Sequence, residues 1–119
     1  MDKVVLARAL ADISEHWRPS VVGVLNGQEV KLAKFCGTFP WHHHADADEL
    51  FLGVDGTFRV EFRDRVIEIG PGEFLVVPRG VEHRTVADAE ASVLLFEPAG
   101  VRNTGNVVDP LYTAPGPPI

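Results

Sequence analysis

The fold of this chain is decided by the stretch His42-His43-His44-Ala45-Asp46-Ala47-Asp48-Glu49, taken together with Gly72-Glu73-Phe74-Leu75-Val76-Val77-Pro78-Arg79-Gly80-Val81-Glu82-His83. Alternate side chains of an extended segment share a face, so His42 and His44 project together while His43 projects to the other side. With the Glu49 carboxylate and the imidazole of His83 they offer three nitrogens and one oxygen to a divalent metal, with room left for water or substrate. The sequence therefore predicts a metal site with the open coordination position that catalysis requires.

The first stretch resembles a motif of the cupin superfamily: Gly, His-x-His, three or four residues, Glu, six residues, Gly. His42, His44, Glu49 and Gly56 fit this spacing, and Gly37 stands one residue closer to His42 than the pattern places it. The match is specific for the fold and for the metal ligands. It does not specify a substrate, because many reactions use this scaffold.

The second stretch resembles the other cupin motif: Gly, five residues, Pro-x-Gly, two residues, His, three residues, Asn. Gly72, Pro78, Gly80 and His83 match it, and Ala87 replaces the terminal Asn. The resemblance to small single-domain type-2 cupins, often described as sugar-phosphate-isomerase-like, implies an all-β jelly-roll barrel, also called a double-stranded β-helix. It also implies a divalent metal, which could be iron, manganese, nickel, zinc, copper or cobalt, held by His42, His44, Glu49 and His83.

The remaining sequence predicts one domain in which a short helix precedes many strands. Apolar residues recur near helical spacing over residues 2–15, and Trp17-Arg18-Pro19 ends the pattern. We expect residues 1–19 to form this helix and a linker, residues 20–100 the barrel and residues 101–119 a C-terminal extension. Asn26-Gly27 predicts a tight hairpin. The expected strands are 21–25, 30–35, 49–52, 58–62, 66–69, 74–77 and 92–96.

Strand periodicity predicts which side chains face the barrel interior. If Glu49 points inward, Phe51 shares its face, whereas Leu50 and Leu52 point outward. Because a free exterior would not need to be apolar, we expect a homodimer that buries this outer face, with residues 21–35 contributing. Phe39, Trp41 and His43 are expected on the alternate face of their segment, in packing or an interface. The candidate pocket residues are Phe51, Phe58, Val60, Phe62, Leu75, Val77 and Phe96.

Composition excludes several classes of partner. The formal net charge is −6, so the chain lacks the basic character that binds nucleic acid. The sequence contains no apolar run of roughly 18 residues that could span a membrane. Cys36 is the only cysteine, which excludes an intramolecular disulfide and fits a cytoplasmic location. Cys36 is expected to be a small apolar filler.

Other polar residues near the motifs receive structural interpretations. His16 stands alone, and Asp46 and Asp48 are expected in a solvated acidic loop because the motif selects Glu49 as the carboxylate ligand. Residues 113–119 are rich in proline and could cover a barrel mouth, although a position in solvent is favoured.

Three functional hypotheses follow. The first is a metal-dependent enzyme acting on a small polar molecule, either a non-haem oxygenase or an isomerase, in which Glu49 could also act as a base. Phosphate recognition would need an inward cation, and Lys34 and Arg84 are the nearby candidates, which weakens the isomerase version. The second hypothesis is a binding module that holds a small ligand without converting it. The third is a structural partner protein with a vestigial site.

Overall fold

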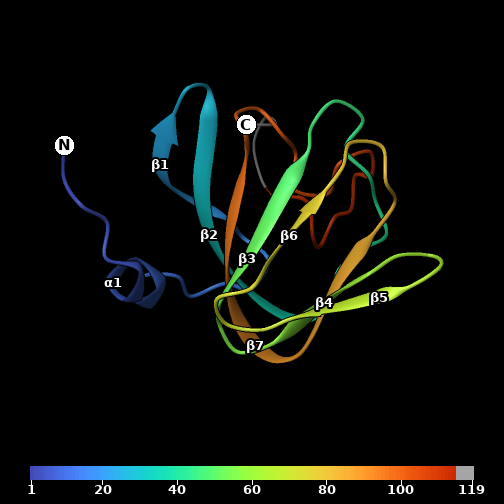
Figure 1. Cartoon of the computed structure of the whole chain (residues 1–119), viewed down its shortest axis with the longest axis horizontal. Coiled ribbons are helices and arrows are strands. Elements are labelled where there is room, and N and C mark those ends of the chain that lie inside the picture. The colour runs from blue at the N-terminus through green and yellow to red at the C-terminus, as the bar shows by residue number, and fades with distance from the viewer. Residues whose placement is uncertain (115–119) are drawn as a thin grey trace.

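The computed structural model describes residues 1–114, and its strands form a single antiparallel system (Figure 1). The sheet order is β1-β2-β7-β3-β6, and β4 pairs with both β5 and β7. The prediction of an all-β barrel preceded by a short helix is confirmed. The elements are α1 (Leu6–Ala11), β1 (Ser20–Leu25), β2 (Gln28–Thr38), β3 (Glu49–Asp55), β4 (Phe58–Glu61), β5 (Val66–Ile69), β6 (Phe74–Val77) and β7 (Arg84–Pro98).

The long strand β7 joins the two halves of the barrel. Its C-terminal part lies between β2 and β3, and its N-terminal part pairs with β4. The register of β2 against β7 shifts between Phe35 and Gly37, where Gly37 has a φ of 91°. Such a bulge bends a strand, which lets β2 contribute to both halves. The predicted strand 92–96 was too short, because the exposed stretch Asp88-Ala89-Glu90 concealed its continuation.

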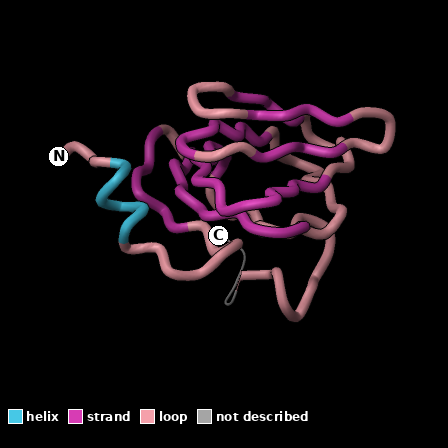
Figure 2. Tube along the Cα trace, turned by 90° about the horizontal axis from the view of Figure 1, so that it is seen from below, coloured by secondary structure: helices cyan, strands magenta, loops and turns pink. Residues whose placement is uncertain are grey.

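The hairpin between β1 and β2 forms at the predicted position. Asn26 and Gly27 have φ values of 51° and 75°, as expected for a turn in which both central residues are left-handed. The helix is shorter than the predicted 2–15, because only Leu6–Ala11 are helical. Figure 2 shows it outside the strands, and its main contacts with the barrel are made to β2. Its one buried residue, Leu10, provides a single apolar anchor, which explains why the helix is short.

The core occupies the space between the two halves of the barrel. Phe35 packs edge-on against Phe51 and Phe58, with ring centroids 6.4 and 5.4 Å away. Glu49 and Phe51 are both buried, whereas Leu50 and Leu52 are only partly buried, which confirms the predicted parity of β3. Within residues 1–114 no helix is long and apolar enough to cross a bilayer.

Candidate metal centre

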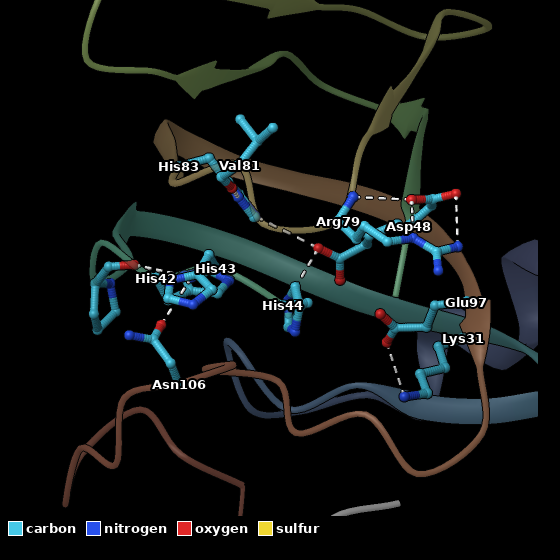
Figure 3. Close-up of polar contacts among 12 residues, drawn as sticks. Lys31, His42, His43, His44, Asp48, Arg79, Val81, His83, Glu97 and Asn106 are labelled. Carbon is cyan, nitrogen blue, oxygen red and sulfur yellow. Dashed lines mark hydrogen bonds and ion pairs between the residues drawn. The ribbon is translucent and has the colours of Figure 1, made fainter. Parts of the chain in front are cut away.

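His42, His44, Glu49 and His83 lie together inside the barrel, as the sequence predicted. One ligand atom from each lies within 4.8 Å of the others, and all four residues are buried. His44 Nε2 and His83 Nε2 lie 3.3 and 3.5 Å from Glu49 Oε1. Figure 3 shows His42 and His44 on one segment of the chain and His83 on another.

Backbone hydrogen bonds hold the histidines in place. His42 and His83 exchange a reciprocal pair of N–H to carbonyl bonds, both 2.9 Å long, which form a single isolated bridge. The carbonyl of His44 accepts a 2.8 Å bond from the Gly80 N–H, in the turn before His83. The residues around His42 therefore do not form the extended strand that the sequence suggested. Isolated contacts to the second motif hold them instead.

The ring orientations of two histidines are also fixed. His42 Nδ1 lies 2.8 Å from the carbonyl oxygen of Pro40, and His83 Nδ1 lies 2.9 Å from that of Val81. A carbonyl oxygen can only accept, so each Nδ1 carries the proton and each Nε2 presents its lone pair to the cluster. This tautomer is the one that a metal at Nε2 requires.

Several atoms of the cluster are buried without a hydrogen-bond partner among residues 1–114. They are His44 Nε2, Glu49 Oε1 and His83 Nε2. A buried polar group without a partner costs about 1–3 kcal/mol, so three at one point require a physical explanation. One cation would satisfy all three atoms at once, and imidazole with a single carboxylate suits divalent transition metals. The donor set therefore fits the metal that the motifs imply.

Burial and charge shift the ionisation of the cluster. Burial and, to a smaller extent, the neighbouring His83 together lower the pKa of His42 to about 4, against the opposing contact with the Pro40 carbonyl. Burial alone would raise the pKa of Glu49, but contacts with His44 and His83 outweigh it and hold this pKa below its usual value. A neutral His42 and an ionised Glu49 are the forms that bind a metal.

A cavity of about 30 Å³, enough for one water molecule, lies beside the cluster. His42 and Glu49 form part of its wall. The rest is mainly aromatic and aliphatic, with three further polar side chains. These other lining residues are Trp17, Pro19, Phe35, Phe39, Phe51, Thr85, Leu95, Glu97 and Asn103.

The residues that line this cavity differ from most of the predicted pocket residues. Phe51 lines it as expected, but Phe58, Val60 and Val77 belong to the packed core, and Phe62 and Leu75 pack against that core. Phe96 is the clearest error. It pairs with Leu50 on the outer face, and its neighbour Leu95 points inward instead.

Trp17 closes one side of the cavity in a strained conformation. Its φ is 62°, which is unusual for a bulky residue and costs about 1–3 kcal/mol. Its backbone N–H donates to the Lys34 carbonyl and its indole N–H to the Cys36 carbonyl, both at 2.9 Å. The ring stacks on Phe35 at 4.5 Å and lies 4.8 Å from Phe39. This role could not be predicted from the sequence, because Trp17 lies outside both motifs.

The segment after β7 covers the same side. Tyr112 lies edge-on to Phe39 and Trp17, and the Tyr112 carbonyl accepts 2.9 Å bonds from Arg18 and Asn103. The first residues of the predicted solvent-exposed tail are held as well, since the Thr113 hydroxyl lies 2.6 Å from that of Thr104. That expectation is wrong for Thr113, and residues 115–119 lie outside the described part of the chain.

Asn106 joins this segment to the histidine stretch. The His43 N–H donates a 2.8 Å bond to Asn106 Oδ1, and the Asn106 N–H donates to the His43 carbonyl at 3.1 Å. His43 is therefore outside the metal cluster, as predicted, and Figure 3 shows it beside Asn106. Phe39 was expected on the same face as His43, but it is buried and lines the cavity.

The sequence analysis missed a buried ion pair inside the barrel. Lys31 Nζ donates a 2.9 Å hydrogen bond to Glu97 Oε1, and both side chains are at most 3% exposed. Burial and the charge of Glu49 raise the pKa of Glu97 to about 9, which Lys31 opposes. Alternation along β2 would have placed Lys31 on the inward face of Phe35, so the signal was present in the strand periodicity.

The other candidate polar residues lie away from the cluster. Asp46 is exposed, and Asp48 accepts bonds from the backbone and guanidinium of Arg79 at 2.9 and 3.2 Å. Lys34 donates to the Ile13 carbonyl, and Arg84 donates to Glu61. Neither proposed phosphate-binding cation lines the cavity. His16 and Cys36 also lie outside it: His16 pairs with Glu90 on the surface, and Cys36 is partly buried.

Comparison with known proteins identifies the family. A family model described as "Cupin domain" matches residues 25–97. An uncharacterized Bacillus subtilis protein named YdbB is 33% identical over 87 residues, which are 71% of this chain and 77% of that protein.

Solved structures agree with this assignment. A cupin-2 domain containing protein from Shewanella frigidimarina is 38% identical, with a TM-score of 0.79 over 80% of this chain and 93% of that one. A Neisseria meningitidis protein is 33% identical, with a TM-score of 0.75 over 82% and 99% of the two chains. The hydroquinone 1,2-dioxygenase PnpCD shares the fold at 21% identity, with a TM-score of 0.66 over 77% of this chain and 70% of that one. Together with the two motifs and the barrel, these matches show that this chain belongs to the cupin family.

Proposed function

We propose that this cupin is a metal-dependent enzyme that acts on a small polar molecule, with a divalent transition metal held by His42, His44, Glu49 and His83. The observation that carries the proposal is the group of three buried, unpartnered ligand atoms, among residues 1–114, beside a cavity. The metal would supply Lewis-acid or redox activation of a substrate oxygen at its open position. Iron, manganese, nickel, zinc, copper and cobalt all suit this donor set.

The side chains around the cluster support this role. The Pro40 and Val81 carbonyls fix the rings of His42 and His83, which limits the reorganisation needed when a metal binds. The lowered pKa of Glu49 makes it a weak base, which favours the ligand role over the additional role of a catalytic base. The aromatic wall formed by Trp17, Phe39 and Phe51 would exclude bulk water from the reacting atoms.

The cavity favours some reaction types over others. Within residues 1–114, the nearest buried cation, Lys31, is bonded to Glu97, and no arginine lines the cavity. A phosphorylated sugar would therefore lack a partner for its phosphate, which weighs against a sugar-phosphate isomerase. A non-haem oxygenase needs no such cation. The similarity to a dioxygenase adds only that the cupin scaffold carries oxygenase chemistry in that protein.

The experiment that tests the metal site compares two adjacent histidines. His44→Gln removes a ligand, whereas His43→Gln removes an imidazole that is outside the cluster and serves as the matched control. Metal content is measured by plasma mass spectrometry after loading with Fe(II), Mn(II) or Zn(II). We expect stoichiometric metal in the wild type and in His43→Gln, and a large loss in His44→Gln. Equal metal content in both variants would contradict the proposed ligand set.

The experiment that tests catalysis follows oxygen consumption and isomerisation by the loaded protein across a panel of small oxygenated substrates. Turnover by the wild type that His83→Gln and Glu49→Gln abolish supports an enzyme. Tight binding of a small molecule without turnover across the panel contradicts catalysis and favours a binding module instead.

We also propose that two copies of the chain associate through the outer face of β3, β6 and β7. Phe74 and Val76 are 65% and 46% exposed and share a face with Leu52 and Leu50, their partners in β3. On the β2 side, Val30 continues this face next to Phe96. A contiguous apolar face of this kind marks an interaction surface, and a second copy would supply a matching face.

Sedimentation at micromolar concentration tests this association. The wild type is expected at twice the 13.0 kDa mass of the chain, and Phe74→Glu as a monomer. A monomeric wild type would contradict the proposal. The cytoplasmic location that the single cysteine suggests stays a prediction.

A further inference from the structure

Residues 103–114 cover one side of the cavity without joining the sheet. They form no helix or strand, and Thr104 is the only buried residue among them. The ends of this segment are joined, because the Ala114 N–H donates a 2.9 Å hydrogen bond to Asn103 Oδ1. A compact surface loop with joined ends is an Ω-loop, and such loops are frequently functional. Figure 1 shows it within the orange-red loops that follow β7.

Most hydrogen bonds of this Ω-loop are internal. Asp109 Oδ1 accepts bonds from the N–H groups of Leu111 and Tyr112, at 2.8 and 3.1 Å. The Thr113 hydroxyl accepts a 2.8 Å bond from the Asp109 N–H and lies 2.6 Å from the Thr104 hydroxyl. These bonds do not depend on the barrel, so the loop can keep its own structure when it separates from the barrel.

A small number of contacts attach the Ω-loop to the rest of the protein. The Arg18 guanidinium donates hydrogen bonds to the carbonyls of Tyr112 and Leu111, at 2.9 and 3.1 Å. Asn106 is bonded to His43, and the Tyr112 ring adds aromatic contacts with the cavity wall. A segment with few buried apolar contacts opens at a lower free energy than the core does. We therefore expect the Ω-loop to be the part of the wall that opens most easily.

The Ω-loop separates two spaces of unequal size. Inside, Asn103 lines the cavity of about 30 Å³ next to the metal cluster. Outside, a cleft of about 250 Å³ lies between residues 43–47 and residues 100–102 and 105–106. Since Asn103 faces one space and its neighbours face the other, a single thickness of chain divides them. The inner cavity has room for about one water molecule, so a hydrated metal ion or a larger molecule can enter only if the wall moves.

We propose that residues 103–114 are a lid that Arg18 holds closed, and that its opening joins the outer cleft to the metal cluster. The four candidate ligand residues are at most 7% exposed, so the closed lid leaves them out of reach of solvent species. The Arg18 side chain is 28% exposed, which lets water replace its two bonds to the lid when the lid opens. The proposal rests on the proposed function for the identity of what enters, but not for the motion itself.

Hydrogen exchange of the metal-free chain, followed by mass spectrometry, tests the motion. We expect the amides of residues 103–114 to exchange faster than those of β2 and β7, because the lid opens while the sheet stays paired. Arg18→Met removes two hydrogen bonds to the lid and should speed exchange of the lid about tenfold. Exchange in β2 and β7 should stay unchanged.

Arg59→Met is the matched control. Arg59 also donates two guanidinium hydrogen bonds, to Glu61 and Asp88, and its side chain is 33% exposed. It lies on β4 and its partners are outside the lid, so Arg59→Met should leave exchange of the lid unchanged. Tyr112→Ala, which removes the aromatic contacts of the lid, provides a second variant if circular dichroism shows that Arg18→Met unfolds. It should also speed exchange of the lid.

Stopped-flow measurement of zinc uptake, and of zinc release to a chelator, tests whether the lid controls access. In Arg18→Met both rates should rise by the same factor as exchange of the lid, because entry and exit use the same open state. The dissociation constant for zinc should stay unchanged, since Arg18 is not one of the four candidate ligands. Damage to the ligands would instead change this constant.

Three results would overturn the inference. They are exchange of the wild-type lid as slow as that of β2 and β7, a folded Arg18→Met with wild-type lid exchange or zinc rates, and an equal acceleration in Arg59→Met. In each case a stoichiometric zinc content leaves the metal site standing. A wild type that takes up no zinc overturns the proposed function, whereas hydrogen exchange still decides whether the lid opens.

Discussion

The stability of the metal-free protein should depend on pH through His42. Its folded-state pKa is about 4, below the ordinary value of 6.5, because burial and the neighbouring His83 disfavour the imidazolium. The unfolded chain therefore takes up a proton at higher pH than the folded chain does. The contribution is fully present above pH 6.5 and is lost progressively as the pH falls toward 4. Between pH 7 and pH 5 the expected loss is about 2 kcal/mol.

Other buried groups also titrate, so the measurement is a difference between two proteins. The raised pKa of Glu97 acts in the opposite sense, since stability is lost as the pH rises from 4.5 toward about 9. His42→Gln retains Glu97 and removes only the imidazole. Urea unfolding at pH 5, 6 and 7 with a chelator present gives the free energy of unfolding of each protein. The wild type should lose about 2 kcal/mol more than His42→Gln between pH 7 and pH 5.

Parallel pH profiles would refute this reasoning. If the free energies of the wild type and His42→Gln differ by a constant amount within about 0.5 kcal/mol, His42 is not held neutral by burial. The cluster would then be more hydrated than its geometry indicates.

Three further predictions concern packing and the metal. Gly105→Ala should destabilise the protein by about 2 kcal/mol or more, because Gly105 has a φ of 55° and an added Cβ would overlap the His43 carbonyl. Thermal unfolding measures this loss. An unchanged midpoint would contradict the packing of the segment around Gly105 against His43. Phe35→Ala should lower the free energy of unfolding in urea by about 3–5 kcal/mol, because Phe35 belongs to the core. Leu111→Ala, at a side chain that is 70% exposed, should change it by less than about 0.5 kcal/mol. Equal effects of the two substitutions would contradict the assigned core. Zinc at a hundred times its dissociation constant should stabilise the wild type by about 2.7 kcal/mol, reversibly with chelator, and no shift would count against binding to the native state.

The fold and the four candidate ligands could be predicted because their signals are local. The spacing of His42, His44 and Glu49 encodes two ligands that share a face and a third at the start of the next strand. Turn residues such as Asn26-Gly27 and Gly80 mark where strands end, and both turns form where the sequence places them. Alternation along β3 correctly assigned Phe51 inward and Leu50 outward.

The cavity wall could not be predicted in the same way, because it depends on packing between distant segments. Trp17 reaches the cavity only through a left-handed backbone conformation stabilised by contacts with β2 and Phe39. Phe96 was assigned inward because the candidate pocket residues were chosen as the apolar set, whereas the inward residues are Leu95 and Glu97. Lys31 was overlooked because charged residues are rarely buried unless they are paired, and its partner lies on another strand.

Anomalous diffraction from crystals of the metal-loaded protein, recorded on both sides of the metal absorption edge, tests the central claim most directly. We expect one strong anomalous peak per chain, bound by His42 Nε2, His44 Nε2, Glu49 and His83 Nε2 at about 2.0–2.2 Å. A peak elsewhere, or a loaded crystal with no peak between these four side chains, would contradict the proposed metal centre.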